Sequence, residues 1–121
     1  MIQLAIDGNQ VEVTVIGQFS LEDFRELEQT VRYGIEFQGQ VHLLFDLRDM
    51  LSYSFDVAWE ELKFSHAHKN DFGRIALLTE DQWLAWSLWI NRLFMSADIH
   101  LFDDLEAARR WVRGDQHLLA A

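Results

Sequence analysis

The sequence has no cysteine and no proline, and it is poor in basic residues. The absence of cysteine excludes disulfides, thiolate metal sites and cysteine nucleophiles. Only 10 Lys and Arg stand against 20 Asp and Glu, which gives a formal net charge of -10. Because this charge repels phosphate backbones and anionic lipid head groups, we expect no nucleic-acid partner.

Long apolar segments are missing as well. No stretch reaches the roughly 20 apolar residues that a transmembrane helix needs. The N-terminus has no basic run followed by an apolar segment, so we expect no signal peptide and a cytoplasmic location. What the sequence does have is 50% hydrophobic residues in a chain of 121, which is enough for one core. We predict a single domain over residues 1–121, in which residues 115–121 form a short tail.

The first third of the chain predicts a β-hairpin followed by a helix. Apolar residues alternate with polar ones on both sides of a Gly8-Asn9 turn, at Ile2, Leu4, Ile6, Val11, Val13 and Val15. Ser20 is placed to cap the helix, and Phe19 is placed to pack on Phe24 across that cap. Helical spacing then continues through the apolar residues Leu21, Phe24, Leu27, Val31 and Ile35.

Three further strands and three further helices alternate along the rest of the chain. The predicted strands are the apolar runs Val41–Leu47, Ile75–Leu78 and Ile99–Phe102. The predicted helices begin near Ser54 or Asp56, at Thr79 and at Asp103, and they end near Lys69, near Met95 and at Gly114. Because strands separated by helices are joined by crossovers, we predict an α/β fold of order ββαβαβαβα. Its mixed five-stranded sheet has an antiparallel first strand, mainly parallel strands otherwise, and helices packed on it.

Several stretches resemble a known family: Trp59–Phe64, Asp71–Phe72, Arg74–Ala76, Trp83, Phe102, Ala107 and Trp111. Together with the element order, they make the chain resemble the SpoIIAA-like proteins of the STAS superfamily, which is named for sulfate transporters and anti-sigma-factor antagonists. The resemblance spans nearly the whole chain and is most specific from Trp59 to Ala76. It implies this fold, a bacterial protein from a family without established catalytic activity, and a relation in shape to lipid-carrying CRAL-TRIO domains.

The phosphorylation motif of STAS antagonists is not repeated in this sequence. In those proteins the serine stands in an Asp-Ser-x-Gly segment at the start of the helix after the third strand. The matching stretch, residues 48–56, contains Ser52 and Ser54, and neither serine has that setting. A phosphate on Ser54 would be favoured at a helix N-terminus, but helix capping is the role that we expect for this residue.

The residue patterns do not predict an enzyme. His66 and His68 are two positions apart on a predicted helix and point in nearly opposite directions, so they would not bind one metal ion together. The other histidines, His42, His100 and His117, belong to other segments. No nucleophile elbow, phosphate-binding glycine loop or dinucleotide fingerprint occurs. We expect no catalytic residue, no metal and no cofactor.

The second and third predicted helices are apolar on more than one face. An apolar pocket between them, suited to a lipid tail, would be lined by Trp59, Leu62, Trp83 and Trp86. Other apolar side chains on these helices are candidates for an interface: Val57, Phe64, Leu84, Leu88, Trp89 and Met95. Three interpretations stay open, namely completion of the core, a homodimer or other protein contact, and an apolar ligand.

We therefore predict a non-enzymatic regulatory or protein-interaction domain that forms a homodimer or binds another protein. The alternative function is a small carrier or sensor of an apolar, lipid-like ligand. No residue pattern identifies the partner, the ligand or the order of the strands in the sheet.

Overall fold

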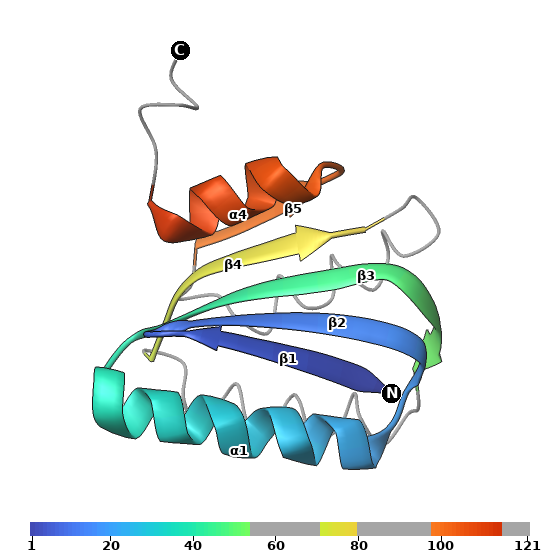
Figure 1. Cartoon of the computed structure of the whole chain (residues 1–121), viewed down its shortest axis with the longest axis horizontal. Coiled ribbons are helices and arrows are strands. Elements are labelled where there is room, and N and C mark those ends of the chain that lie inside the picture. Colours follow the sequence, from blue (N-terminus) through green and yellow to red (C-terminus); the bar gives the residue numbers. More distant parts are fainter. Residues whose placement is uncertain (54–70, 80–97, 115–121) are drawn as a thin grey trace.

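The computed structural model describes residues 1–53, 71–79 and 98–114, and its centre is a single five-stranded sheet (Figure 1). The strands are β1 (Ile2–Asp7), β2 (Gln10–Phe19), β3 (Val41–Tyr53), β4 (Phe72–Leu78) and β5 (Asp98–Phe102). The helices among these residues are α1 (Leu21–Gln38) and α4 (Leu105–Arg113). The second and third predicted helices fall on residues outside the described ranges.

The strands lie in the sheet in the same order as in the chain, β1-β2-β3-β4-β5. β1 is antiparallel to β2, and every other neighbouring pair is parallel. The predicted mixed sheet with an antiparallel first strand is therefore confirmed. The order of the strands across the sheet was not predicted, because no residue pattern indicates it.

The N-terminal hairpin forms as predicted. In its register Ile2 lies opposite Val15, and Ile6 lies opposite Val11, so the alternating apolar side chains share one face of the sheet. Gly8 occupies the turn with a φ of 60°, a conformation that glycine adopts without steric cost.

The first helix begins with the predicted cap. The Ser20 Oγ accepts a hydrogen bond from the Asp23 N–H at 3.2 Å, and the Asp23 carboxylate accepts one from the Ser20 N–H at 3.1 Å. These two bonds form a capping box, which satisfies donors that a helix start leaves unpaired. Phe19 packs edge-to-face on Phe24 across the cap, with ring centroids 6.5 Å apart. The start and direction of α1 are thus set by neighbouring residues.

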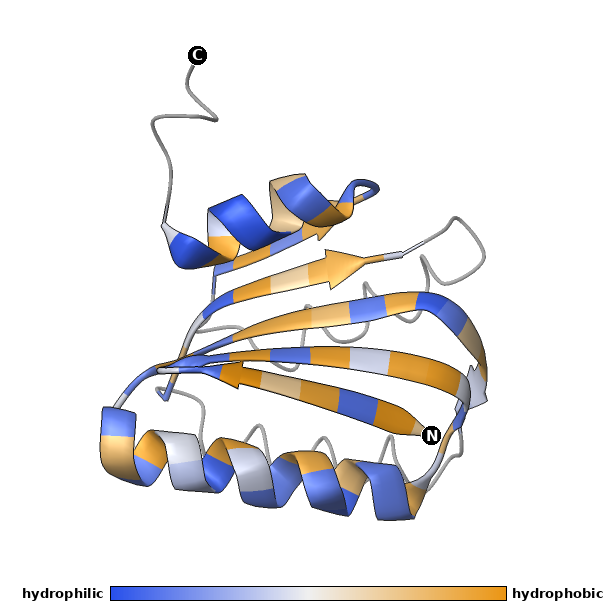
Figure 2. Cartoon of the chain, in the orientation of Figure 1, coloured by the Kyte–Doolittle hydropathy of each residue, from blue (hydrophilic) through white to orange (hydrophobic). Residues whose placement is uncertain are grey.

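The two described helices lie on opposite faces of the sheet (Figure 1). On the α1 face, the buried stripe of Phe24, Leu27 and Val31 belongs to a large apolar cluster that includes the inward side chains of β2, β3 and β4. On the α4 face, a smaller cluster consists of Leu44, Ala76, Ala108, Trp111 and Val112. The carboxyl-terminal half of β4 is continuously hydrophobic, as Figure 2 shows, because its residues contribute to both clusters.

Several predicted boundaries differ from the structure: β4 begins at Phe72 instead of Ile75, and β5 begins at Asp98 instead of Ile99. The third strand was predicted to end at Leu47, but β3 continues to Tyr53 because it pairs with the last residues of β2. The cap of α4 was predicted at Asp103, but the residue in that role is Asp104, whose carboxylate accepts from the Ala107 N–H at 3.0 Å. Gly114 ends α4 as predicted, in the left-handed conformation at a φ of 90°.

Candidate functional site

The site residues predicted from the second and third helices fall in residues 54–70 and 80–97, outside the described ranges. They comprise the pocket candidates Trp59, Leu62, Trp83 and Trp86, the interface candidates Val57, Phe64, Leu84, Leu88, Trp89 and Met95, and the serine Ser54. His66, His68 and His117 are also outside these ranges. All of these assignments stay predictions, so the candidate site is built below from residues of the sheet, α1 and α4.

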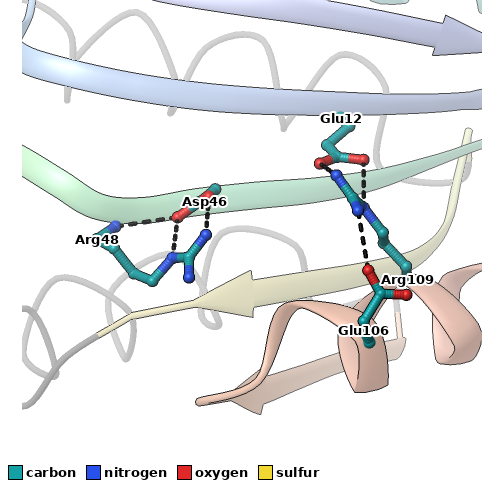
Figure 3. Close-up of polar contacts among 5 residues, drawn as sticks. All are labelled: Glu12, Asp46, Arg48, Glu106 and Arg109. Atoms are coloured by element: carbon teal, nitrogen blue, oxygen red, sulfur yellow. Dashed lines mark hydrogen bonds and ion pairs between the residues drawn. The ribbon is translucent and has the colours of Figure 1, made fainter.

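A buried carboxylate lies on the α4 face of β3. The Asp46 side chain receives three hydrogen bonds from Arg48: from its backbone N–H at 3.2 Å, from Nε at 2.9 Å and from Nη2 at 2.8 Å (Figure 3). Burial alone would raise the pKa of Asp46, but the hydrogen bonds and positive charge of Arg48, with the charge of Arg109, outweigh it and hold the pKa below its ordinary value. Asp46 therefore stays ionised and is suited to fixing Arg48, not to donating a proton.

A second ion-pair group joins β2 to α4. The Arg109 guanidinium binds Glu12 in a bidentate manner, through Nη2 at 2.8 Å and Nε at 3.2 Å, and it reaches Glu106 through Nη1 at 3.0 Å (Figure 3). Hydrogen bonds from Arg109 to Glu12, together with the negative charge of both carboxylates, raise the pKa of Arg109 despite partial burial. These paired charges hold α4 in register over the sheet.

The described residues contain neither a metal-binding cluster nor a membrane-spanning helix. Within residues 1–53, 71–79 and 98–114, no three His, Asp or Glu side chains lie close enough together to hold a metal ion. Neither α1 nor α4 is long and apolar enough to cross a membrane.

An exposed apolar surface lies where α1 passes the edge of the sheet. Ile6 is 63% exposed, Tyr33 is 65% exposed and Phe37 is 62% exposed, and the two aromatic rings lie 4.5 Å apart between centroids. Beside them is a groove of about 470 Å³, which we call the edge groove. Its lining combines the apolar side chains of Ile6, Val11, Tyr33 and Val41 with the polar side chains of Asn9, Gln29, Thr30 and Gln38. The surface was not predicted, although Tyr33 and Phe37 stand four residues apart, which places them on one face of a helix.

The backbone of β1 contributes to the same surface. Met1 and Ile16 exchange two hydrogen bonds, Ile16 N–H to Met1 O at 2.8 Å and Met1 N–H to Ile16 O at 3.1 Å. Because bonded and non-bonded pairs alternate in an antiparallel ladder, the backbone groups of Ile2, Leu4 and Ile6 face away from β2. β1 is the edge of the sheet, so among the described residues no strand pairs with these groups.

Comparisons with known proteins agree with this fold. The SpoIIAA-like family matches residues 10–113, from the first residue of β2 to the last residue of α4. No protein of curated function matches the chain.

Solved structures with the same fold are distant in sequence. An uncharacterized protein of the DUF3478 family from Shewanella loihica PV-4, with a SpoIIAA-like fold, matches with a TM-score of 0.73 and 18% identity over 93% of this chain and 92% of that one. The anti-sigma factor antagonist SpoIIAA in its unphosphorylated form matches with a TM-score of 0.62 and 14% identity, over 94% of this chain and 99% of that one. The Bacillus cell fate determinant SpoIIAA in its phosphorylated form matches with a TM-score of 0.58 and 15% identity, over 92% and 99%.

The family match covers most of the chain, and the structural matches agree with the sheet and helices described above. The chain belongs to the SpoIIAA-like family and has the SpoIIAA-like fold.

Proposed function

We propose that this chain is a non-enzymatic regulatory domain of the cytoplasm that acts by binding another polypeptide. The observation that carries the proposal is the edge of β1, which no other described strand pairs with, together with the exposed Ile6, Tyr33 and Phe37. Contiguous exposed apolar patches mark interaction surfaces, whereas scattered exposed apolar residues do not. Membership in a family with anti-sigma factor antagonists among its structural relatives supports the same role.

The proposed binding mode is the addition of a strand to β1. An incoming extended segment would pair with the outward backbone groups of Ile2, Leu4 and Ile6 and place an apolar side chain in the edge groove. Edge strands commonly carry lysine, proline or a bulge that prevents such pairing. β1, with the sequence IQLAID and a regular register, has none of these.

A second copy of the chain is the occupant that we propose for this edge. Two antiparallel copies of β1 related by a twofold axis at Leu4 would place Leu4 opposite Leu4 and Ile2 opposite Ile6, so that apolar residues meet apolar residues. Ile6 would then lie beside Ile2 of the second copy, on one face of a sheet that continues through both copies. A dimer through the third helix remains a separate prediction on residues outside the described ranges.

The experiment is native mass spectrometry combined with light scattering on the wild type and on Ile6→Lys. We expect a wild-type dimer and an Ile6→Lys monomer with unchanged circular dichroism, because Ile6 is 63% exposed within one copy and the new charge would be placed against the apolar Ile2 of the second copy. Leu101→Lys is the matched control, since Leu101 is 47% exposed on β5 at the opposite edge and its replacement should leave the dimer intact.

Hydrogen exchange gives a second measurement of the same proposal. The outward amides of Leu4 and Ile6 should become protected as the protein concentration rises, because they would form bonds across the dimer. A wild-type monomer in which these amides exchange rapidly at every concentration would show that β1 does not pair with itself.

The second candidate function is the carrier of an apolar ligand, which the volume and apolar lining of the edge groove favour. A carrier should bind a fluorescent fatty acid in a fixed ratio, and Ile6→Lys should abolish that binding. A domain that only pairs with polypeptides should leave the probe unbound at protein concentrations at which it forms a dimer.

A further inference from the structure

A polar cavity lies at the amino ends of the parallel strands, beside the carboxyl end of α4. Its volume is about 590 Å³, and the residues that carry its chemistry are His42, Gly73, Arg74, Asp98 and Arg113. We call it the amino-end cavity. β3 ends at Tyr53, at the opposite end of the sheet from this cavity.

The imidazole of His42 is held in one tautomer at the wall of the cavity. Its Nδ1 accepts the Arg74 backbone N–H at 2.8 Å, so Nδ1 carries no proton and the remaining proton is on Nε2. Burial and the positive charge of Arg74 lower the pKa of His42, which favours this neutral form. His42 is therefore oriented as a hydrogen-bond donor through Nε2.

Gly73 is the residue that makes room for this imidazole. A Cβ at position 73 would collide with the Cε1 and Nδ1 atoms of His42. The β3–β4 register also shifts between Val41 and Leu43, at the position of His42. The local backbone is thus shaped around the ring, which is more than packing of an exposed histidine would require.

Two guanidinium groups line the same cavity. Arg74 donates through Nη1 to the Trp111 carbonyl at 3.1 Å and lies 5.8 Å from the Trp111 ring, so the group is fixed while its other N–H groups remain for a ligand. Within the part of the chain that the structure describes, Arg113 donates only through Nε, to the Arg109 carbonyl at 3.3 Å. Asp98 is the carboxylate in this lining, and its Oδ1 lies 3.1 Å from His100 Nε2.

We propose that the amino-end cavity binds a small oxyanion of the phosphate type, through Arg74, Arg113 and the Nε2–H of His42. Among the described residues, two positive charges and one carboxylate line this cavity, although the whole chain has a net charge of -10. Donors from β3, β4 and α4 suit an ion with several acceptor oxygens, and arginine matches phosphate through paired N–H groups. Binding there would tie the end of α4 to the starts of β3 and β4.

The test is a titration of the full chain with inorganic phosphate, followed by NMR at constant ionic strength against chloride. We expect saturable shifts at the His42 side-chain nitrogens and at the Gly73 and Arg74 amides. Arg113→Gln should weaken binding about tenfold or more, the amount that one hydrogen bond to a charged group contributes. Arg32→Gln, which removes an exposed charge on α1, is the matched control and should change nothing.

Two further arms sharpen the result. Asp98→Asn should tighten phosphate binding, because it removes the negative charge from the cavity without removing a donor to the ion. If phenyl phosphate binds as tightly as inorganic phosphate, the site accepts an ester-linked phosphate. If only inorganic phosphate binds, the ligand is the free ion. Both outcomes support the site. Linear shifts spread over all arginines, an unchanged affinity in Arg113→Gln, or equal binding of acetate would overturn the proposal.

Discussion

The two faces of the sheet differ in the interactions that their side chains make. The α1 face is one continuous apolar cluster that runs from Ile2 to Leu77, whereas the α4 face combines a small apolar cluster with the Asp46–Arg48 and Glu12–Arg109–Glu106 ion pairs. Apolar burial contributes most of the free energy of folding, while ion pairs between partly exposed side chains, such as Glu12 and Arg109, contribute little. Within residues 1–53, 71–79 and 98–114, apolar burial is therefore concentrated on the α1 face, while ion pairs fix side chains and α4 on the other face.

The largest effect is expected from a cavity on the α1 face. Phe19→Ala should lower the free energy of unfolding by about 3 to 5 kcal/mol, because Phe19 is fully buried and its ring holds the start of α1. Val112→Ala, the corresponding test on the α4 face, should cost about 2 kcal/mol. Urea denaturation of both variants measures the difference, and equal losses would contradict the asymmetry between the faces.

The buried carboxylate of the α4 face should have an intermediate effect. Asp46→Asn removes the charge that receives three hydrogen bonds from Arg48, so we expect a loss of about 1 to 3 kcal/mol in urea denaturation at neutral pH. Asp49→Asn, on the neighbouring exposed residue, is the control and should stay within about 0.5 kcal/mol of the wild type. If both variants behave alike, Asp46 does not organise this face.

The same carboxylate should make stability fall in acid. The pKa of Asp46 is lowered from its ordinary value of 3.8, so its contribution is complete above that pH and is lost as the pH falls through the lowered value. The stability of Asp46→Asn should therefore depend less on pH below about pH 4. Because the pKa of His42 is lowered from its ordinary value of 6.5, protonation of His42 in the unfolded chain should also reduce stability as the pH falls below 6.5. This loss should be the same in the wild type and in Asp46→Asn.

The smallest effect is expected from the ion pairs that join β2 to α4. Glu12→Gln and Arg109→Gln should each cost about 1 kcal/mol or less, because the Arg109 side chain is 39% exposed and solvent screens the pair. A double-mutant cycle at low and high salt isolates the coupling between them. A coupling that salt does not reduce would mean that the α4 face is less exposed to solvent than its charges suggest.

The parts of the fold that were predictable depend on neighbouring residues. The hairpin, the Ser20 cap, the Phe19–Phe24 contact and the buried stripe of α1 all follow from alternation or spacing within a few positions. Parallel strands were predictable too, because crossovers leave almost no other arrangement. Local signals were sufficient wherever the interacting residues are close in sequence.

The rest depends on contacts between distant residues. β3 runs past Leu47 because its polar continuation pairs with β2, and Arg109 meets Glu12 across 97 positions of the chain. The exposure of Tyr33 and the contact between His42 and Gly73 likewise depend on how the helices and strands pack against one another. The spacing of residues along the chain does not indicate which distant residues come into contact, so neither the edge groove nor the amino-end cavity was predictable.

The strands follow one another in the sheet in the order in which the ribosome makes them. β1 and β2 pair locally, and each later strand of the described sheet then adds beside the strand made before it. Chains that acquire structure N-terminus first can therefore extend this sheet at its growing side without reopening a finished pair. Each strand is added at the side of the sheet farthest from β1. The outer backbone of β1 is therefore accessible to other molecules as soon as the hairpin forms.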